Sequence, residues 1–175
     1  MNLKFTLAYD GSLFQGSQKQ PNGMTVEDKL LKAFKKINIE TNIVLSGRTD
    51  KEVHATGQIF NCVVPDFWQD FFKLKDILNK NLPSSIKILR IQKVKDDFHS
   101  RFHAKKRVYR YLITTKPTTP FNNKFITHIK NVDEELLQKA IKEFIGVYDF
   151  KYFHKTGSDK ELTKREIFDA KFYKY

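Results

Sequence analysis

The order in which strand-like and helix-like segments alternate over residues 3–94 constrains the fold of this chain more than any other feature. Residues 3–9 alternate apolar and polar side chains, as a half-buried strand does. Thr25 then precedes residues 26–37, whose apolar side chains recur at helical spacing, and Asp66 precedes a second amphipathic helix that carries Trp68. Three further segments have strand character: residues 42–45, 58–64 and 86–94. The resulting β-α-β-β-α-β order is typical of the ferredoxin-like split β-α-β fold.

The chain changes character after residue 100. Eight basic and no acidic residues occur between positions 101 and 132. The patterns that follow predict a strand, a helix closed by Gly146, and a final strand, at residues 108–115, 133–145 and 165–175. We therefore expect an α+β protein with two domains. Residues 1–100 would form a ferredoxin-like antiparallel sheet with helices on one face, and residues 101–175 a partial, incomplete C-terminal α+β domain.

The charge balance indicates an acidic partner. The 175 residues include 32 Lys and Arg against 20 Asp and Glu, a formal net charge of +12. Nucleic acid is the first candidate partner and an anionic membrane surface the second, whereas a lysine-rich proteome would be the neutral explanation. The single cysteine, Cys62, excludes an intrachain disulfide. Because we find neither a signal core nor an apolar run of about 20 residues, we expect a cytoplasmic protein without a membrane partner.

The densest polar cluster of the sequence is the segment SGRTDKEVH, residues 46–54, between two expected strands. Asp50 has cationic neighbours in Arg48 and Lys51, and a cation close in space would lower the pKa of its carboxyl. An ionised carboxylate in a dry pocket can act as a nucleophile or general base. Equally, an aspartate at this position can cap its own turn or pair with Arg48. The residues alone leave both interpretations open.

A basic and aromatic segment follows at residues 101–111. Lys and Arg bind phosphates, and unstacked bases pack on aromatic rings, so the segment is typical of RNA binding. Its candidate RNA-binding residues are Arg101, Lys105, Lys106, Arg107 and Arg110. The alternative is a strand with Tyr109 and Tyr111 in the core and Arg110 in solvent. We expect no metal site, since the nearby histidines His99 and His103 lack a third ligand.

Three stretches resemble the TruA-type tRNA pseudouridine synthases, and the resemblance as a whole extends over essentially the entire chain. The first is Tyr9-Asp10-Gly11 with Phe14, Gly16, Gln18 and Gln20; the second is Gly47-Arg48-Thr49-Asp50 with Val53-His54-Ala55 and Gly57-Gln58; the third is Phe98-His99-Ser100-Arg101-Phe102 followed by Arg107, Tyr109 and Tyr111. The resemblance implies the pseudouridine synthase fold. It also implies an isomerase that needs no cofactor and no metal.

The resemblance further implies a role for three of these residues. Asp50 would be the catalytic nucleophile that attacks the target uridine, at the sugar or at the base. Tyr109 would pack on the uracil, and Arg48 would help to extrude the base and fill its place. The substrate would be the anticodon arm of tRNA at positions 38 to 40, where the target base must leave the stack.

Two departures from the family pattern are visible. Where the family normally has Ala-Gly after the aspartate, this chain has Lys51-Glu52. The family also continues for roughly a third more chain, including an arginine that pairs with the catalytic aspartate, and its homodimers depend on that region. A homodimer is therefore not expected of these residues alone. A catalytically inactive or truncated RNA-binding module of the same fold is the alternative to an active enzyme.

Overall fold

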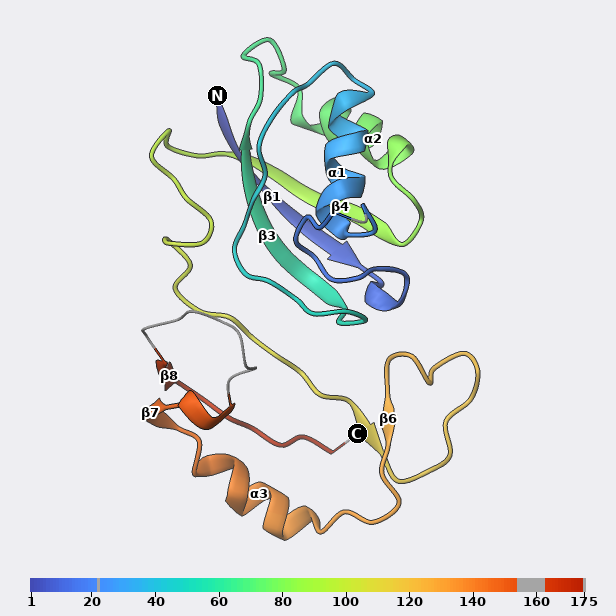
Figure 1. The fold of residues 1–175 in the computed structure, drawn as a ribbon, viewed down its shortest axis with the longest axis vertical. Helices are drawn as coiled ribbons and strands as arrows, with labels where there is room; N and C mark the ends of the chain where they lie inside the picture. The colour runs from blue at the N-terminus through green and yellow to red at the C-terminus, as the bar shows by residue number, and fades with distance from the viewer. Residues whose placement is uncertain (22, 154–162, 175) are drawn as a thin grey trace. The chain divides into compact units, whose positions relative to one another are not determined.

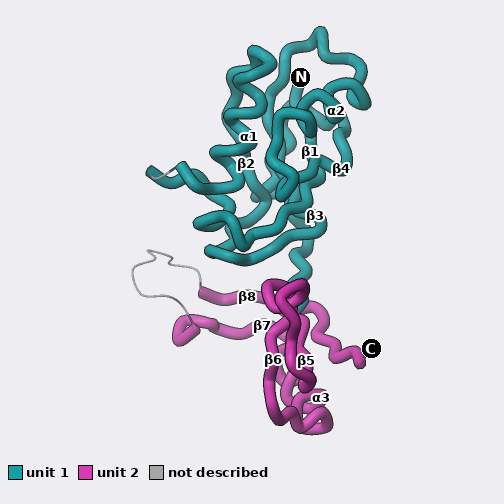
Figure 2. The backbone as a smooth tube through the Cα atoms, turned by 90° about the vertical axis from the view of Figure 1, so that its right-hand side faces the viewer, with its two compact units in different colours: residues 1–110 teal, residues 111–175 magenta. Residues whose placement is uncertain are grey.

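The computed structural model describes residues 1–21, 23–153 and 163–174 (Figure 1). The chain divides into two compact units, Met1–Arg110 and Tyr111–Tyr175 (Figure 2). This division falls after Arg110, beyond the boundary expected after residue 100. The assignment of residues 1–100 and 101–175 to two domains stays a prediction. None of the helices in the described part of the chain has the length and hydropathy that crossing a membrane requires.

The first unit is built on a four-stranded sheet in the order β2-β3-β1-β4. Its strands are β1 (Asn2–Tyr9), β2 (Val44–Leu45), β3 (Ala55–Val63) and β4 (Ile86–Lys93), and every neighbouring pair is antiparallel. The two helices, α1 (Val26–Lys35) and α2 (Phe71–Asn81), lie over the same face of the sheet (Figure 1). The predicted β-α-β-β-α-β order and the α+β class are confirmed.

The core of this unit lies between the sheet and its helices. The alternation of β1 places Leu3, Phe5 and Leu7 on the helix-bearing face, where all three are fully buried. The Phe5 ring stacks on Phe60 of β3 with 4.5 Å between the ring centroids. Phe34 of α1 meets the Phe5 ring edge-on at 5.7 Å. Aromatic pairs in these geometries stabilise a fold beyond the apolar area they bury.

Both helices of this unit begin after a residue whose side chain caps the helix. Thr25 is the N-cap of α1, and its side chain and that of Asp28 form a reciprocal capping box, as its position predicts. The expected start of α2 after Asp66 is wrong, because Asp70 caps that helix by accepting a hydrogen bond from Lys73 N at 2.9 Å. Trp68 therefore lies before the helix.

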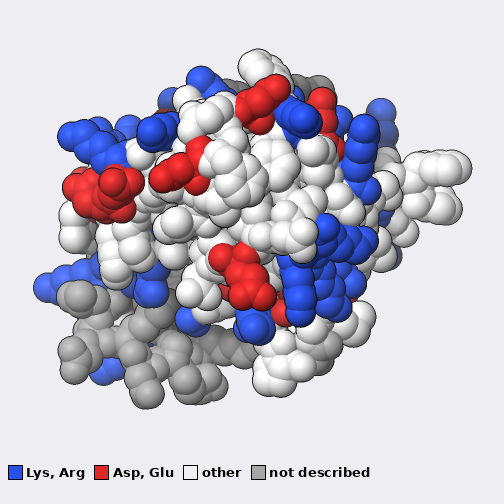
Figure 3. Space-filling view, turned by 90° about the horizontal axis from the view of Figure 1, so that it is seen from above, with Lys and Arg blue, Asp and Glu red and all other residues white. Residues whose placement is uncertain are grey.

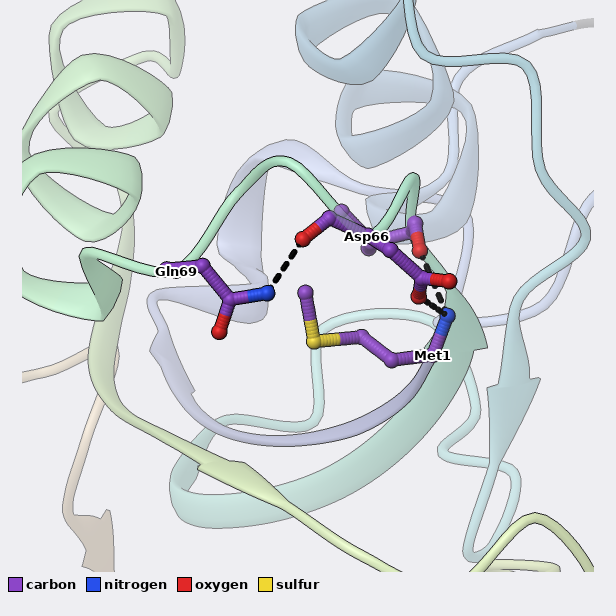
Figure 4. A network of polar contacts seen from close by, with 4 residues as sticks. Met1, Asp66 and Gln69 are labelled. Atoms are coloured by element: carbon purple, nitrogen blue, oxygen red, sulfur yellow. Dashed lines mark hydrogen bonds and ion pairs between the residues drawn. The ribbon is translucent and has the colours of Figure 1, made fainter.

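Asp66 instead holds the first residue of the chain (Figure 4). The amine of Met1 lies 2.6 Å from Asp66 Oδ1 and donates to Val64 O at 2.8 Å. This amine, as hydrogen-bond donor and as positive charge, lowers the pKa of the Asp66 carboxyl. The Gln69 side-chain amide donates to the Asp66 carbonyl. Residues 64–69 are thus tied to the start of β1.

Residues 94–110, which we call the connecting segment, lead out of β4 without regular structure. Two buried asparagines fasten its first part to the sheet. Asn2 Nδ2 donates to Phe98 O at 2.9 Å, and Asn61 Nδ2 donates to Asn2 Oδ1 at 3.0 Å. Ser100 N in turn donates to Asn61 Oδ1 at 2.8 Å. The backbone near residues 98–100 is therefore fixed by the sheet.

The second unit contains three small groups of elements. Strands β5 (Ile113–Thr114) and β6 (Thr127–His128) pair in parallel, and α3 (Glu134–Lys142) follows with Asp133 as its N-cap. Strands β7 (Gly146–Asp149) and β8 (Lys164–Ile167) pair antiparallel, with a short 3-10 helix at Lys151–Phe153 between them in sequence. No residue described in this unit is buried.

Three predictions for this half of the chain are wrong in extent. The strand expected over residues 108–115 is limited to β5, because among these eight residues only Ile113 and Thr114 pair with another strand. The final strand, expected over residues 165–175, is β8 and ends at Ile167. Gly146 does not close α3. It opens β7 with φ +131°, a backbone conformation that side chains disfavour.

Candidate active site

The loop that carries Asp50 connects β2 to β3, as the sequence predicts, and spans residues 46–54. Its first two residues are fixed by a side chain of β3. Gln58 Nε2 donates to Gly47 O at 2.5 Å, and Ser46 Oγ lies 3.2 Å from Gln58 Oε1. The start of the loop is therefore held against the sheet before the chain reaches Arg48.

The middle of the loop is paired with the segment that follows β1. Ser17 N donates to Thr49 O at 3.0 Å, and Thr49 N donates to Ser17 Oγ at 2.8 Å. The hydroxyls of Tyr9 and Thr49 are 2.8 Å apart. These three bonds fix the residue immediately before Asp50.

Two glycines let the two backbones approach this closely. A Cβ on Gly11 would lie 2.0 Å from Val53 O, and a Cβ on Gly16 would lie 2.9 Å from Thr49 O. Gly16 also has φ +106°, which glycine adopts without strain. Next to them, Gly11 N lies 3.0 Å from His54 Nδ1. Residues 11–17 thus form a backbone cradle for the loop, at contact distances that no side chain would permit.

Asp50 and Arg48 are both exposed at the surface of the first unit. Among the described residues, Asp50 forms no ion pair with Arg48 or Lys51. Lys51 Nζ instead lies 3.4 Å from Glu52 Oε1. Val53 N donates to the backbone carbonyl of Asp50 at 3.3 Å, which closes a turn. The carboxylate is thus presented outward on a loop whose backbone is fixed on both sides.

Glu52 adopts φ +66° within this turn. For a residue with a Cβ, the left-handed region costs about 1–2 kcal/mol, and glycine is the residue that avoids the cost. The Ala-Gly pattern expected from the resemblance would place glycine at this position. The departure at Lys51-Glu52 therefore has a structural consequence, which is backbone strain next to Asp50.

Tyr109 is exposed over 69% of its surface. The pKa of Tyr9 is raised, chiefly by burial of its hydroxyl, and Tyr109 adds a smaller electrostatic contribution in the same direction. Tyr9 is also the residue whose hydroxyl bonds to Thr49 of the loop. The alternative interpretation with both tyrosines in the core is wrong, since Tyr111 is 91% exposed.

The basic candidates all belong to the connecting segment and all are exposed: Arg101, Lys105, Lys106, Arg107 and Arg110. The Arg101 guanidinium lies over the Phe102 ring, 5.8 Å from its centroid. The His99 ring stacks on Phe102 with 4.2 Å between the ring centroids, and these three side chains form an aromatic cluster. An open hollow of about 890 Å³ beside this cluster is lined by Lys93, Lys95, Lys105 and His103, among others. On the face drawn in Figure 3, Lys and Arg cover more area than Asp and Glu.

The two histidines of this segment accept hydrogen bonds from backbone amides. His99 Nδ1 accepts from the backbone amides of Arg101 and Phe102, both at 3.3 Å, and His103 Nδ1 accepts from His99 N at 3.2 Å. Among the described residues no group of three His, Cys, Asp or Glu side chains is placed to hold a metal ion.

The residues that position the loop were not identified from the sequence. Tyr9, Gly16 and Gln58 belong to the stretches that carry the resemblance, so the signal was present, but their roles depend on contacts across the sheet. Ser17 carries no signal of its own in the sequence.

Comparison with known proteins identifies the family of this chain. A family model described as tRNA pseudouridine synthase matches residues 6–103. "tRNA pseudouridine synthase A" of Wolinella succinogenes is 37% identical over 97% of this chain, and that of Helicobacter pylori is 39% identical over 98%. The protein of the same name from Streptococcus agalactiae is 37% identical over 96%. This chain spans about two thirds of the relatives' length, at 67%, 69% and 66% respectively. The chain belongs to the tRNA pseudouridine synthase family.

Proposed function

We propose that this protein is a tRNA-uridine isomerase that converts uridine to pseudouridine in the anticodon stem-loop, at positions 38 to 40, with Asp50 as the nucleophile. The observation that carries the proposal is the loop itself. An exposed carboxylate follows Thr49, whose backbone amide, carbonyl and hydroxyl are all bonded to residues after or within β1. A group positioned in this way meets a reactant without first being ordered.

The reaction exchanges one glycosidic bond for another. The Asp50 carboxylate attacks the uridine at the sugar or at the base, and the bond from N1 of uracil to C1′ of ribose breaks. The freed uracil turns and C5 bonds to C1′, while the bond between the substrate and Asp50 breaks and restores the carboxylate. The hydrogen on C5 leaves as a proton, and N1 takes up a proton. No oxidant or reductant is consumed, since the product is an isomer of the substrate. We expect the chemistry to need no cofactor.

The surroundings of the loop supply the other requirements of this reaction. A uracil detached from ribose needs an aromatic surface, which the exposed ring of Tyr109 would offer. Arg48 precedes Asp50 by two residues and is exposed, so it can fill the space of an extruded base. The basic connecting segment and the net charge of +12 favour binding to the tRNA backbone, with a steep dependence on salt.

The alternative is a catalytically inactive or truncated RNA-binding module of the same fold. Two observations favour it: the strained φ of Glu52 beside Asp50, and a second unit in which no described residue is buried. Such a module would bind tRNA through the same basic residues and would leave the uridine unchanged.

Tritium release from tRNA labelled at uridine C5 tests the proposal, because forming the C5 bond expels that hydrogen. Wild type should release tritium, and Asp50→Asn should release none while its tRNA affinity stays within a few-fold. Asp76→Asn, an exposed carboxyl on α2, is the matched control and should behave as wild type. No release by a folded wild type that binds tRNA would establish the inactive module. Near-normal release by Asp50→Asn would remove Asp50 from the mechanism.

A further inference from the structure

We infer that Arg107 is a positioning residue of the Asp50 loop: it holds the backbone at Ser46 and packs against Gly47, whose carbonyl is bound by Gln58. The catalytic consequence of this inference rests on the proposed function, whereas the structural role does not. It differs from the role expected from the sequence, in which Arg107 binds an RNA phosphate.

The guanidinium of Arg107 makes a two-donor contact with one carbonyl. Its Nη2 lies 2.6 Å and its Nε 3.1 Å from Ser46 O, across 61 residues of sequence. Nη2 also lies 3.4 Å from Arg101 O within the connecting segment. Hydrogen bonds from a charged donor are shorter and stronger than neutral ones, and the planar fork of arginine fixes the direction of the contact.

The absence of a side chain at Gly47 leaves room for this contact. A Cβ at Gly47 would lie 3.1 Å from Arg107 Nε and 3.5 Å from Arg107 Cδ. At the first of these distances the arginine would have to give way, so glycine allows the guanidinium to pack against the loop backbone. The same Gly47 presents its carbonyl to Gln58 on β3. Two successive carbonyls at the start of the loop are therefore bound by two side chains from different parts of the first unit.

Arg107 can act as a support because its own segment is anchored. The bonds of Asn2 and Asn61 to Phe98 O and of Ser100 N to Asn61 Oδ1 fix the connecting segment to the sheet, seven residues before Arg107. The sheet thus holds Ser100, and seven residues later Arg107 bonds to Ser46 at the start of the loop. Arg48 and Asp50 follow from that fixed point.

The two possible roles of Arg107 make opposite kinetic predictions. A phosphate contact adds affinity and a share of the salt dependence, equally before and during the reaction. A positioning contact leaves binding unchanged and raises the rate of the bound complex, because a displaced reactive group lowers the rate. Arg107→Ala, Arg107→Lys and the control Lys105→Ala separate them. Lys105 is exposed, lies two residues away and lines the hollow beside Phe102.

The first experiment measures single-turnover tritium release at saturating tRNA together with tRNA affinity over a range of salt. Both Arg107 variants should lower the saturated rate about tenfold or more, since lysine cannot reproduce the fork, with unchanged salt slope and affinity within about twofold. Lys105→Ala, at a candidate RNA-binding residue, should weaken tRNA affinity and reduce the salt slope by about one. Lys87→Ala, at an exposed lysine on β4, should leave the saturated rate unchanged. An Arg107→Ala that loses salt slope and keeps its saturated rate would overturn the inference.

The second experiment needs no activity and so separates this inference from the proposed function. Amide hydrogen exchange in the free protein should speed up about tenfold at Thr49 and Val53 in both Arg107 variants and stay unchanged in Lys105→Ala. Amides of β1 in the same samples report any global loss of structure, and they should be unchanged. Unchanged exchange at Thr49 and Val53 would show that the loop does not depend on Arg107, whether or not wild type releases tritium.

Discussion

The two units of this chain have similar helix caps and similar apolar patterns, but among the described residues only those of the first unit include buried side chains. In the first unit, α1 has a Thr25 cap, and its Leu30 and Phe34 are fully buried. In the second unit, α3 has an Asp133 cap and an equally apolar face, yet Leu136 is 62% exposed. A cap and a periodic pattern are thus sufficient to form a helix, whereas burial requires a second surface that the described part of the second unit does not supply.

The difference bears on the candidate active site. The Asp50 loop is bonded to β1, β3 and the segment after β1, all of which belong to the unit with the core. A loop fixed to elements of high stability keeps its geometry between encounters with substrate. The predictions below test whether the two units differ in stability as they differ in burial, beginning with the largest expected effect.

The largest effect is expected from removing a core ring. Phe5→Ala deletes a fully buried side chain that stacks on Phe60, and should lower the free energy of unfolding by about 3–5 kcal/mol. Phe121→Ala, at a ring 91% exposed in the second unit, should change it by less than about 0.5 kcal/mol. The only tryptophan, Trp68, packs against the core of the first unit, so its fluorescence in urea measures this difference. Equal losses in both variants would mean that the second unit is as well packed as the first.

Most of the first unit could be predicted from its sequence because its signals are local. The alternation of Leu3, Phe5 and Leu7 and the cap at Thr25 depend on neighbouring residues only, and both predictions are confirmed. The prediction for the start of α2 failed because it depended on a long-range contact. Asp66 has the residue type of a cap, but its partner is the amine of Met1, 65 positions away. No local pattern contains that information.

At the candidate site, too, some features follow from local sequence and others from long-range contacts. The motif around Asp50 could be recognised from residue types at fixed spacing. The contacts that hold the loop could not, because Arg107 reaches Ser46 and Tyr9 reaches Thr49 across 61 and 40 residues of sequence. The strand expected over residues 108–115 forms only at β5, also for a long-range reason. A strand needs a partner, and the alternation of apolar and polar residues does not identify one. The roles of Asp50, Tyr109 and Arg48 stay predictions.

The next effect in size compares the two helix caps. Thr25→Ala removes a buried cap whose hydroxyl bonds Asp28 at both its amide and its carboxylate, and should cost about 1–2 kcal/mol of stability. Asp133→Ala removes the cap of α3, where Leu136 N is accessible to water, and should leave the unfolding of the first unit unchanged. Urea titrations followed by Trp68 fluorescence give both values. A matching loss in Asp133→Ala would show that α3 unfolds together with the core.

A smaller effect, of opposite sign, is expected at Glu52. Glu52→Gly should raise stability by about 0.5–1 kcal/mol, because glycine adopts φ +66° without the steric cost of a Cβ. The exposed ion pair with Lys51 that the change removes contributes little. Asn38→Gly is the matched control. Its φ of +58° is similar, but asparagine tolerates this region, so thermal melts should show almost no gain there. A loss of stability in Glu52→Gly would mean that the side chain has contacts worth more than the strain.

The smallest expected effect is the pH dependence of stability, which should differ between the two units. The pKa of Asp66 is lowered in the folded state, first by its hydrogen bond and then by its charge interaction with the Met1 amine. A lowered folded-state pKa stabilises the fold above the unfolded value of about 3.9, and this contribution disappears as the pH falls through the folded-state pKa. Asp66→Asn should therefore be less stable than wild type at pH 7, and the difference should shrink below about pH 4.

Asp149 on β7 provides the counterpart in the second unit. Its pKa is also lowered, first by a hydrogen bond from Thr163 and then by the amide of Lys151 at 3.0 Å. The sign is the same, but the stabilised structure is the β7–β8 pair, whose residues are not buried. Asp149→Asn should leave the urea midpoint seen by Trp68 unchanged from pH 7 to pH 3. If it shifts that midpoint as Asp66→Asn does, the two units unfold as one cooperative structure, and the contrast in burial is not a contrast in stability.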